Sequence, residues 1–323
     1  MLHIALDKKL IMQSASTILM IKPTGFRFNE ETAINNHFQL ADNSRSTEQI
    51  KANAISEFNA MVSLLRSKGV NVIVYGHKDG DKLPDAVFPN NWFSTHDNGQ
   101  VYLYPMNAEN RRLERKLEIF DELESKHNFR ISNIVDFTHG ENQDLFLEGT
   151  GSMILDRVNK YIYASISTRT SLKLLKEFAQ KISFEVISFK SHHNKSLDSP
   201  LIYHTNVMMC LASSFVVICM DAIIDKNERE RVSKKLAETK KKMIEISFDQ
   251  MNSFAGNMLE VQNNMGIKYL MMSSTAYHSL RPEQLNQIQE FVEIIHSPLD
   301  TIETLGGGSA RCMMAEIFLP KIK

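Results

Sequence analysis

The feature that most constrains the fold of this chain is a helical pattern that recurs five times along its 323 residues. The first helical segment shows the pattern clearly, because Ser46 and Gln49 form a capping box at its start and Gly69 follows its end. The five predicted helices cover residues 47–68, 109–126, 171–181, 227–242 and 282–295. Regular recurrence of one supersecondary unit indicates a repeat or propeller-like architecture.

Short runs rich in Val, Ile, Tyr and Phe lie between the helices, as is typical of β-strands. The predicted strands cover residues 18–21, 70–75, 101–104, 152–155, 161–164, 185–189, 215–219, 243–246, 258–261, 268–272 and 316–319. Two or three strands therefore accompany each helix. A doubly wound α/β sheet is the competing interpretation. It is weakened because no phosphate-binding glycine fingerprint opens any of these helices.

The composition is that of an ordinary globular protein, with 43% hydrophobic and 23% charged residues. No linker rich in Pro, Gly or Ser divides the chain, so we predict one domain over residues 1–323. The net charge of −1 gives no overall field that would attract nucleic acid or an anionic membrane. The most apolar stretch, residues 207–220, is too short to span a bilayer.

The three cysteines do not make a disulfide framework, which favours a reducing, cytoplasmic setting. Cys210 and Cys219 lie in apolar strands, where we expect them to be buried and inert. Cys312 differs, because the run Gly-Gly-Gly-Ser-Ala-Arg leads directly into it. Glycines let a ligand approach the main chain, so a cysteine on such a turn is placed for nucleophilic attack. The alternative is a small buried core residue, and the local sequence leaves both open.

Four further segments place polar side chains beside turns or strands. They are Leu-Pro-Asp-Ala-Val-Phe-Pro-Asn-Asn-Trp at 83–92, Leu-Glu-Gly-Thr-Gly at 147–151, Ser-Ile-Ser-Thr-Arg-Thr at 165–170 and Tyr-His-Thr-Asn at 203–206. Together with residues 306–313, their order resembles the guanidine-modifying superfamily, which includes arginine deiminase, dimethylarginine dimethylaminohydrolase and the amidinotransferases. The resemblance runs from Leu83 to Cys312. It implies a five-bladed α/β propeller of ββαβ modules with the active site on the central axis.

The resemblance also implies roles for particular residues. Cys312 matches the nucleophile, His204 the general acid/base and Glu148 the carboxylate beside that histidine. Three charged residues match substrate contacts: Arg169 and, less closely, Arg111 for the substrate α-carboxylate, and Asp85 for its amino group. No metal or other cofactor is implied. The expected binding partners are a small amino-acid substrate and a second copy of the chain, with which it would form a homodimer.

These residue types suit the chemistry independently of the resemblance. The thiolate is the reactive form of cysteine, and a neighbouring cation favours it. A histidine can supply that charge and then protonate the leaving nitrogen. A carboxylate beside the histidine is expected to favour its protonated form. Arginine binds a carboxylate through two parallel hydrogen bonds.

The chain departs from the family pattern where acidic residues are expected. Asn90 and Asn91 stand where family members have acids, the pattern Glu-Gly-Gly-Asp is here Glu-Gly-Thr-Gly at 148–151, and Asn206 replaces an Asp two residues after the histidine. Amides carry no net charge and both donate and accept hydrogen bonds, which suits a neutral ureido group. The departures predict citrulline as the substrate, hydrolysed to ornithine.

Other functions remain open on the sequence alone. Arginine deiminase or dimethylarginine dimethylaminohydrolase activity would use the same nucleophile on a cationic substrate. An amidinotransferase would pass the group to an amine in place of water. A non-catalytic propeller could bind a partner, although the presence of Cys312, His204 and Glu148 together argues against that.

Overall fold

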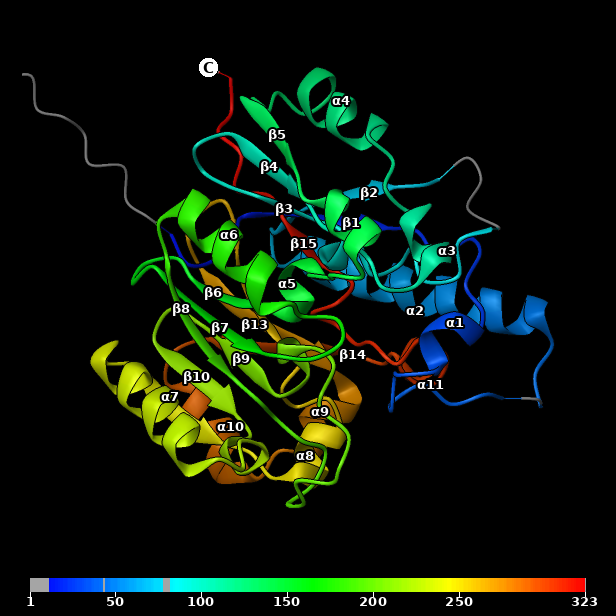
Figure 1. The fold of residues 1–323 in the computed structure, drawn as a ribbon. Coiled ribbons are helices and arrows are strands. Elements are labelled where there is room, and N and C mark those ends of the chain that lie inside the picture. The colour runs from blue at the N-terminus through cyan, green and yellow to red at the C-terminus, as the bar shows by residue number, and fades with distance from the viewer. Residues whose placement is uncertain (1–11, 43, 78–81, 323) are drawn as a thin grey trace, which may run out of the picture.

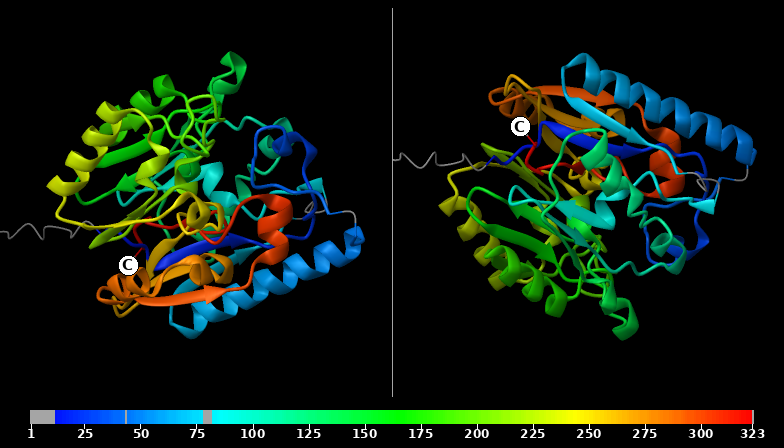
Figure 2. Two further views of the ribbon diagram at one scale, coloured as in Figure 1. Left: turned by 90° about the horizontal axis from the view of Figure 1, so that it is seen from below. Right: turned by 90° about the horizontal axis from the view of Figure 1, so that it is seen from above.

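A computed structural model describes residues 12–42, 44–77 and 82–322 of the chain. It contains five small sheets of three strands each, arranged around a central axis (Figures 1 and 2). This confirms the predicted five-bladed α/β propeller. The part of the predicted domain that falls on residues 1–11, 43, 78–81 and 323 lies outside the described residues.

Each sheet, or blade, has the same topology. A middle strand pairs antiparallel with a leading strand on one side and parallel with a third strand on the other. In the order leading, middle and third strand, blade 1 contains β15 (Ala315–Glu316), β1 (Thr17–Ile21) and β2 (Asn71–Tyr75), and blade 2 contains β3 (Phe93–Thr95), β4 (Gln100–Leu103) and β5 (Asn133–Asp136). Blade 3 contains β6 (Ile154–Asp156), β7 (Tyr161–Ser165) and β8 (Glu185–Phe189), and blade 4 contains β9 (Met209–Leu211), β10 (Phe215–Ile218) and β11 (Lys242–Glu245). Blade 5 contains β12 (Leu259–Gln262), β13 (Lys268–Ser273) and β14 (Glu293–Ser297).

A helix connects the middle strand of each blade to its third strand, as a parallel pair requires. These helices are α2 (Thr47–Ser67), α4 (Glu118–Ser125), α6 (Leu172–Ile182), α7 (Lys226–Glu238) and α10 (Pro282–Gln289). Helix α2 begins with the predicted capping box, in which the Ser46 side chain accepts from the Gln49 N–H and the Gln49 side chain accepts from the Ser46 N–H. Its buried stripe includes Ala54, Phe58 and Met61, which pack onto blade 1 and α11.

Shorter helices lie in the connections between these elements. They are α1 (Glu30–Ala33), α3 (Glu109–Arg112), α5 (Gly149–Ser152), α8 (Phe248–Asn252), α9 (Ser274–Ser279) and α11 (Asp300–Gly306), together with 3₁₀ turns at Pro89–Asn91, Thr138–Gln143, Thr205–Val207 and Met220–Ala222. Helix α5 and two of the 3₁₀ turns stand directly before leading strands, which matters for the site below. Among the helices of residues 12–42, 44–77 and 82–322, none combines the length and apolar character that a membrane crossing requires.

The ring is closed by the two ends of the described chain. Strand β15 pairs antiparallel with β1, with Leu19 opposite Ala315. Apolar side chains fill the space between the blades and their outer helices, and buried examples are Trp92, Phe178 and Phe215. Polar side chains are also gathered between the blades, where Arg311 forms an ion pair with Glu316 and Glu260 accepts from the Ser213 N–H.

The predicted helix at 109–126 is wrong as one element, because the chain forms two short helices, α3 and α4. The break has a tertiary cause. Glu114 is fully buried, and both its carboxylate oxygens accept from Arg111 at 2.9 Å. This buried ion pair fixes the turn after α3, and the helical propensity of the segment does not override it.

The predicted helix at 282–295 is also too long. It ends at Gln289, and Glu293–Ser297 forms β14, paired parallel with β13. The short strands β3 and β5 were not predicted, and β9 was indicated only by the expectation that Cys210 lies in an apolar strand. The predicted strand at 152–155 begins only at Ile154, because Gly149–Ser152 is helical, and the strand predicted at 316–319 is β15 at Ala315–Glu316.

Candidate active site

The candidate site is built from similar positions in all five blades, namely residues that lie two to six positions before each leading strand. Asn90 and Asn91 precede β3, Glu148 precedes β6, His204 and Asn206 precede β9, Asn257 precedes β12, and Cys312 precedes β15. Because the blades surround one central axis, their leading strands all begin at the same end of the propeller. The fold therefore brings together residues that are 222 positions apart, from Asn90 to Cys312, without any of them being close in sequence.

Glu148 and His204 form a direct pair. The His204 Nε2 atom lies 2.7 Å from Glu148 Oε2, and both side chains are buried. The other carboxylate oxygen, Glu148 Oε1, accepts from the Asn107 N–H at 2.9 Å. Burial alone would raise the pKa of Glu148, but Arg169, His204 and Arg111 outweigh it and hold that pKa at about 2.

Glu148 does favour the protonated form of His204, as expected, but this effect does not decide the pKa of His204 in the free protein. Burial lowers the pKa of His204 more than the hydrogen bond and charge of Glu148 raise it, and Arg169 and Arg111 lower it further. The pair is thus an ionised carboxylate beside a neutral imidazole. Such an imidazole can first accept a proton and then donate it.

Two glycines make this pairing possible. Gly149 has a φ of +48°, and a Cβ atom there would lie 2.3 Å from the Asn90 carbonyl oxygen. Gly151 follows two residues later, and a Cβ atom there would lie 2.5 Å from Asn91 Nδ2 and 2.9 Å from His204 Nδ1. The Glu-Gly-Thr-Gly segment therefore allows blades 2, 3 and 4 to approach one another at the axis.

Cys312 lies on the loop between α11 and β15. Gly307, at the end of α11, adopts a φ of +63°, and Cβ atoms at Gly306 or Gly308 would meet the ring of Phe88 at 2.8 Å. The sulfur receives two amide N–H groups, from Asn206 Nδ2 and Asn257 Nδ2, each at 3.3 Å. These two donors hold the sulfur at the edge of the pocket without adding a charge.

Sequence reasoning missed Asn257. Its Nδ2 also donates to the Asn206 carbonyl at 3.0 Å, and its Oδ1 accepts from the Arg311 N–H at 3.1 Å. The side chain therefore ties blade 4, blade 5 and the cysteine loop together. One signal could have found it: Asn257 stands directly after a glycine and before a leading strand, as the other site residues stand before theirs.

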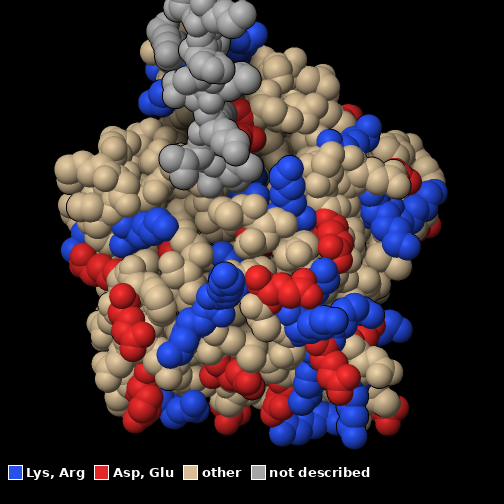
Figure 3. Space-filling view, turned by 90° about the vertical axis from the view of Figure 1, so that its left-hand side faces the viewer, with Lys and Arg blue, Asp and Glu red and all other residues tan. Residues whose placement is uncertain are grey.

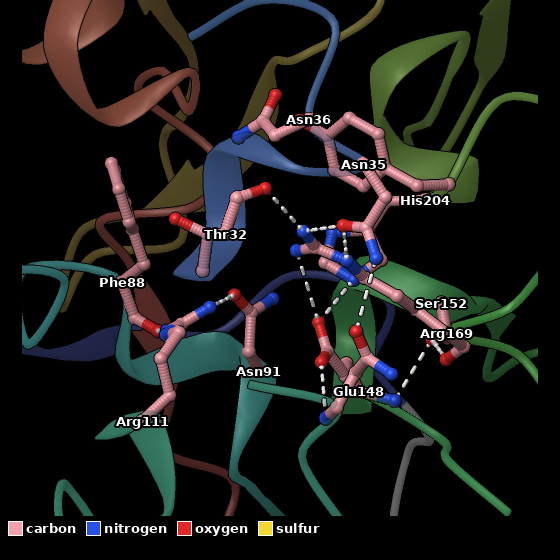
Figure 4. A network of polar contacts seen from close by, with 12 residues as sticks. Thr32, Asn35, Asn36, Phe88, Asn91, Arg111, Glu148, Ser152, Arg169 and His204 are labelled. Carbon is pink, nitrogen blue, oxygen red and sulfur yellow. Dashed lines mark hydrogen bonds and ion pairs between the residues drawn. The ribbon is translucent and has the colours of Figure 1, made fainter. Parts of the chain in front are cut away.

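Arg169 lies across the site (Figure 4). On one side, its guanidinium is 3.5 Å from Glu148 Oε2. On the other side, it donates to Asn35 Oδ1 and to the Thr32 carbonyl, and it lies 4.8 Å from the centre of the Tyr203 ring. The predicted carboxylate-binding arginine is therefore buried and already bonded to uncharged groups that a carboxylate could replace.

Arg111 is held differently, because both its ends have partners. Besides the two bonds to Glu114, its Nη1 donates to Asn91 Oδ1 at 2.8 Å. Burial lowers the pKa of Arg111, but the charge of Glu114 and its hydrogen bond more than compensate, so the guanidinium remains ionised. Burial also raises the pKa of Glu114, to about 7. Sequence reasoning did not find Glu114.

Asp85 and the amides leave buried polar atoms without partners in the described part of the chain. Asp85 Oδ2 accepts from Asn29 Nδ2 at 2.7 Å and from Thr32 Oγ1 at 3.1 Å, whereas Asp85 Oδ1 has no partner there. Asn90 Oδ1, Asn91 Nδ2 and Asn206 Oδ1 are also without partners among the described residues. Such orphaned groups cost free energy unless a ligand satisfies them. Burial raises the pKa of Asp85.

One pocket, here called the Cys312 pocket, joins most of the predicted residues. Its lining consists of Thr32, Asn36, Asp85, Phe88, Asn91, Arg111, Arg169, Tyr203, His204, Gly306, Gly307, Gly308 and Cys312. Glu148 lies behind His204, and Asn90 contacts Thr150, so neither of them lines it. The open space is about 20 Å³, room for one water, so an amino acid can enter only if side chains such as Arg169 move.

The other cysteines lie as expected. Cys210 and Cys219 are buried and unpaired, and burial raises the pKa of their thiols to about 12 and about 11. Within the residues that the structure describes, no group of three or more His, Cys, Asp or Glu side chains could hold a metal ion.

Comparison with known proteins connects this geometry to characterised families. Residues 22–319 match the family model described as N,N dimethylarginine dimethylhydrolase, eukaryotic. No curated protein matches the chain. Among solved structures, the N-terminal domain of ArgZ, covalently bound to a reaction intermediate, superposes with a TM-score of 0.71 at 18% identity, covering 94% of this chain and 99% of that one.

Two further structures share the fold. Full-length ArgZ, an arginine dihydrolase from the ornithine-ammonia cycle in Cyanobacteria, superposes with a TM-score of 0.72 at 18% identity; 95% of this chain is covered, but only 41% of that longer chain. An adduct of dimethylarginine dimethylaminohydrolase with S-methyl-L-thiocitrulline superposes with a TM-score of 0.59 at 15% identity, covering 93% of this chain and 99% of that one.

Proposed function

This chain belongs to the eukaryotic N,N-dimethylarginine dimethylhydrolase family within the pentein superfamily, and on that premise we propose that it is a cysteine-dependent hydrolase of a free amino acid with a ureido or guanidino side chain. The superfamily resemblance read from the sequence is thereby confirmed. The enzyme class is a hydrolase acting on carbon–nitrogen bonds. The preferred substrate we propose is citrulline, with ornithine as product.

The observation that carries this proposal is the set of groups around Cys312. Two neutral amides, Asn206 and Asn257, donate to the sulfur, and a neutral imidazole, His204, lines the same pocket. The Glu148–His204 pair can accept the proton of the thiol and later donate it. These are the parts that nucleophilic displacement at a carbon–nitrogen bond requires.

The proposed reaction has two steps. The Cys312 thiolate attacks the ureido carbon, His204 gives its proton to the departing nitrogen, and ornithine leaves with the Cys312 sulfur bonded to the carbamoyl carbon. A water molecule, deprotonated by His204, then attacks that carbon and breaks the carbon–sulfur bond. The product carbamic acid decomposes to carbon dioxide and ammonia. No metal or cofactor takes part in either step.

The other end of the substrate would be bound by groups already in place. Arg169 faces Asn35 and Thr32, uncharged groups that an α-carboxylate could replace. Asp85 Oδ1, without a partner in the described chain, is placed to accept from an α-ammonium group. Arg111 would act through Asn91, whose Oδ1 it holds, so that the free Asn91 Nδ2 points toward a ureido oxygen.

The preference for citrulline over arginine rests on the amides. A charged hydrogen bond contributes roughly 1.5–3 kcal/mol and a neutral one about 1 kcal/mol, so replacing acids by amides weakens binding of a guanidinium. The family match and the arginine dihydrolase among the similar structures support arginine or dimethylarginine as the alternative substrate. An enzyme that hydrolysed the guanidino group of arginine to a ureido group, and then hydrolysed that group, would also give ornithine.

The proposal extends to the whole chain and its setting. We propose that residues 1–323 form a single catalytic domain, because residues before all five leading strands contribute to the site. A reducing, cytoplasmic location is supported by three cysteines that are all unpaired. A homodimer is proposed as the assembly, and mass photometry of the purified protein would test it.

One assay tests the substrate. The ratio kcat/KM is measured for citrulline, arginine, methylated arginines and agmatine on one preparation of the wild type and of Asn91→Asp. We expect citrulline to give the highest ratio, and Asn91→Asp to lower it because a carboxylate cannot donate to a ureido oxygen. A higher ratio for arginine than for citrulline in the wild type would refute the substrate while leaving the mechanism standing.

A second assay separates an enzyme from a binding module. Cys312→Ser should fold normally and lose turnover of every substrate by at least about 1,000-fold, since a hydroxyl is a far weaker nucleophile. Cys210→Ser is the matched control, because that thiol is buried away from the pocket. Full turnover by folded Cys312→Ser would exclude the covalent mechanism.

A further inference from the structure

We propose that a second cavity, at the opposite end of the propeller from the Cys312 pocket, binds a small organic anion that carries a carboxylate or phosphate on an apolar body. The cavity has a volume of about 550 Å³, within the range of small-molecule sites. Its position follows from the strand directions. Leading strands β6 and β15 start beside the Cys312 pocket, and the cavity is lined by Arg157, directly after β6, and by Ile317 and Phe318, directly after β15.

The lining of this second cavity is strongly basic. Arg157, Lys160, Lys181 and Lys321 contribute four positive charges, and Asp97 is the single acidic residue among the described residues that line it. Over the face drawn in Figure 3, acidic and basic side chains are intermixed, so that face carries no charge of one sign as a whole. The positive lining is thus a local feature of a chain whose net charge is −1.

Arg157 is the strongest sign that an anion belongs there. Its side chain is only 8% exposed, and its guanidinium lies 3.8 Å from the centre of the Phe318 ring. In the described part of the chain, that guanidinium forms no hydrogen bond or ion pair; the only hydrogen bond of the residue is from its backbone N–H to Gln13. The carboxylates of Glu316 and Asp97 act on this guanidinium only through longer-range attraction, which Arg311 opposes, so its N–H donors have no acceptor among the described residues. Five such donors in a planar fork suit a carboxylate or phosphate.

The remaining lining explains why the ligand should have an apolar body. Phe129, Phe184 and Phe318 contribute ring surface to the same cavity. Burial of Arg157 also lowers its pKa, an effect that a bound anion would oppose. A phosphate ester and a carboxylic acid would satisfy the site through the same chemistry, and the choice between them is left to the binding experiment.

The experiment measures binding of three probes by isothermal titration calorimetry. Phenyl phosphate and 3-phenylpropanoate are the anions, and 3-phenylpropanamide is the uncharged match. We expect the wild type to bind at least one anion and not the amide, and the tighter anion identifies the source. The double variant Lys160→Gln/Lys181→Gln, both exposed lysines, should weaken that binding about fivefold. Lys176→Gln, an exposed lysine of the same helix α6 that does not line the cavity, is the control.

Two further variants complete the test. Arg157→Gln should abolish binding if its circular dichroism spectrum is that of the wild type, and Arg169→Gln should leave binding intact, because Arg169 lies in the Cys312 pocket. Equal affinity for the amide, an unchanged affinity in the lysine double variant, or loss of binding in Arg169→Gln would each overturn the proposal. None of these outcomes depends on which substrate the enzyme hydrolyses.

Discussion

At the scale of single residues, the least expected member of the site is Asn257, which touches the sulfur, the Asn206 carbonyl and the Arg311 N–H at once. Asn257→Asp keeps the shape and the acceptor for Arg311 but removes both N–H donors and puts a negative charge beside the sulfur. Because the sulfur loses a donor and gains a neighbouring negative charge, we expect alkylation of Cys312 by iodoacetamide at pH 7 to slow at least about tenfold.

The control for this substitution is Asn252→Asp, at the exposed end of helix α8. It introduces the same charge in the same blade without contacting the sulfur. An equal loss of alkylation rate in both variants would show a general effect of charge. An unchanged rate in Asn257→Asp would mean that the amide does not support the reactive sulfur.

Glu148 should make stability depend on pH in a defined window. Its folded pKa of about 2 lies below its ordinary value of 4.5. Ionised Glu148 therefore increases the free energy of unfolding above pH 4.5, and this contribution is lost as the pH falls from 4.5 toward 2. The difference corresponds to roughly 3 kcal/mol. Urea unfolding should show that the difference between wild type and Glu148→Gln is larger at pH 7 and falls by roughly half or more at pH 3.

Glu290→Gln, an exposed glutamate at the end of α10, serves as the control and should behave as the wild type at both pH values. An equal difference between wild type and Glu148→Gln at pH 7 and pH 3 would contradict the assigned ionisation. The turnover of Glu148→Gln should also fall, because His204 loses the carboxylate that stabilises its protonated form during reaction.

The residue scale also shows what a sequence can and cannot reveal about a site. Cys312, His204, Glu148, Arg169, Arg111 and Asp85 were recognisable as candidates because reactive or charged types stood in an ordered set of motifs. Asn257 and Glu114 escaped notice because an isolated amide and a glutamate in a charged helix carry no chemical signature. The balance between burial and charge at His204 was also beyond the sequence, since it depends on how many groups surround the ring.

At the scale of elements, the site depends on the short helix α5, whose two outer glycines let neighbouring blades meet. Gly151→Ala would place a methyl group 2.5 Å from Asn91 Nδ2 and 2.9 Å from His204 Nδ1. Overpacking of this kind costs about 1–3 kcal/mol. We expect kcat/KM to fall at least tenfold as both side chains are displaced, since a cost near 1.4 kcal/mol in the transition state is already tenfold.

Gly76→Ala is the matched control, because no atom of the described residues lies within 4 Å of a Cβ atom built there. It should leave both activity and melting temperature unchanged. If Gly151→Ala melts lower but retains the wild-type kcat/KM, the close approach at α5 serves folding and does not position the site.

Helices and strands were predicted best where the pattern of apolar residues in the sequence was long and regular. The long amphipathic helix α2 was placed within one residue at its end, since its stripe and cap are local properties. Strands β3 and β9 have only three residues each, too few for an alternating pattern to emerge. Strand β14 was absorbed into the preceding helix because Phe-Val-Glu-Ile-Ile fits either period, and only pairing with β13 decides between them.

At the scale of the whole molecule, the active site depends on the closed ring, because all five blades contribute residues to it. Each blade contributes a residue from the segment before its leading strand, so the sequence spacing of these residues reflects the length of a blade; they are Asn90, Glu148, His204, Asn257 and Cys312. The recurrence of helices could therefore predict the architecture, and the ordered motifs could predict the pocket. What the recurrence could not predict is the second cavity, whose lining is drawn from loops after β6 and β15 and before β7 and β8, at the far ends of the same strands.

Closure of that ring depends on a very short strand, and this gives a prediction for the whole fold. Strand β15 has two residues, but it is followed by Ile317 and Leu319, which are buried against Leu19 and Ile73 of blade 1. The Ile317 N–H donates to the Thr17 carbonyl at 2.9 Å. Removal of residues 315–323 should therefore leave blade 1 open on one side and abolish the cooperative thermal transition.

Removal of residues 322 and 323 alone should change the melting temperature by only a few degrees, because Ile322 is exposed and contributes one backbone hydrogen bond, to Asn128. Circular dichroism during heating distinguishes the two truncations, and a sharp transition near that of the full chain in the longer truncation would show that four closed blades suffice to hold the fifth.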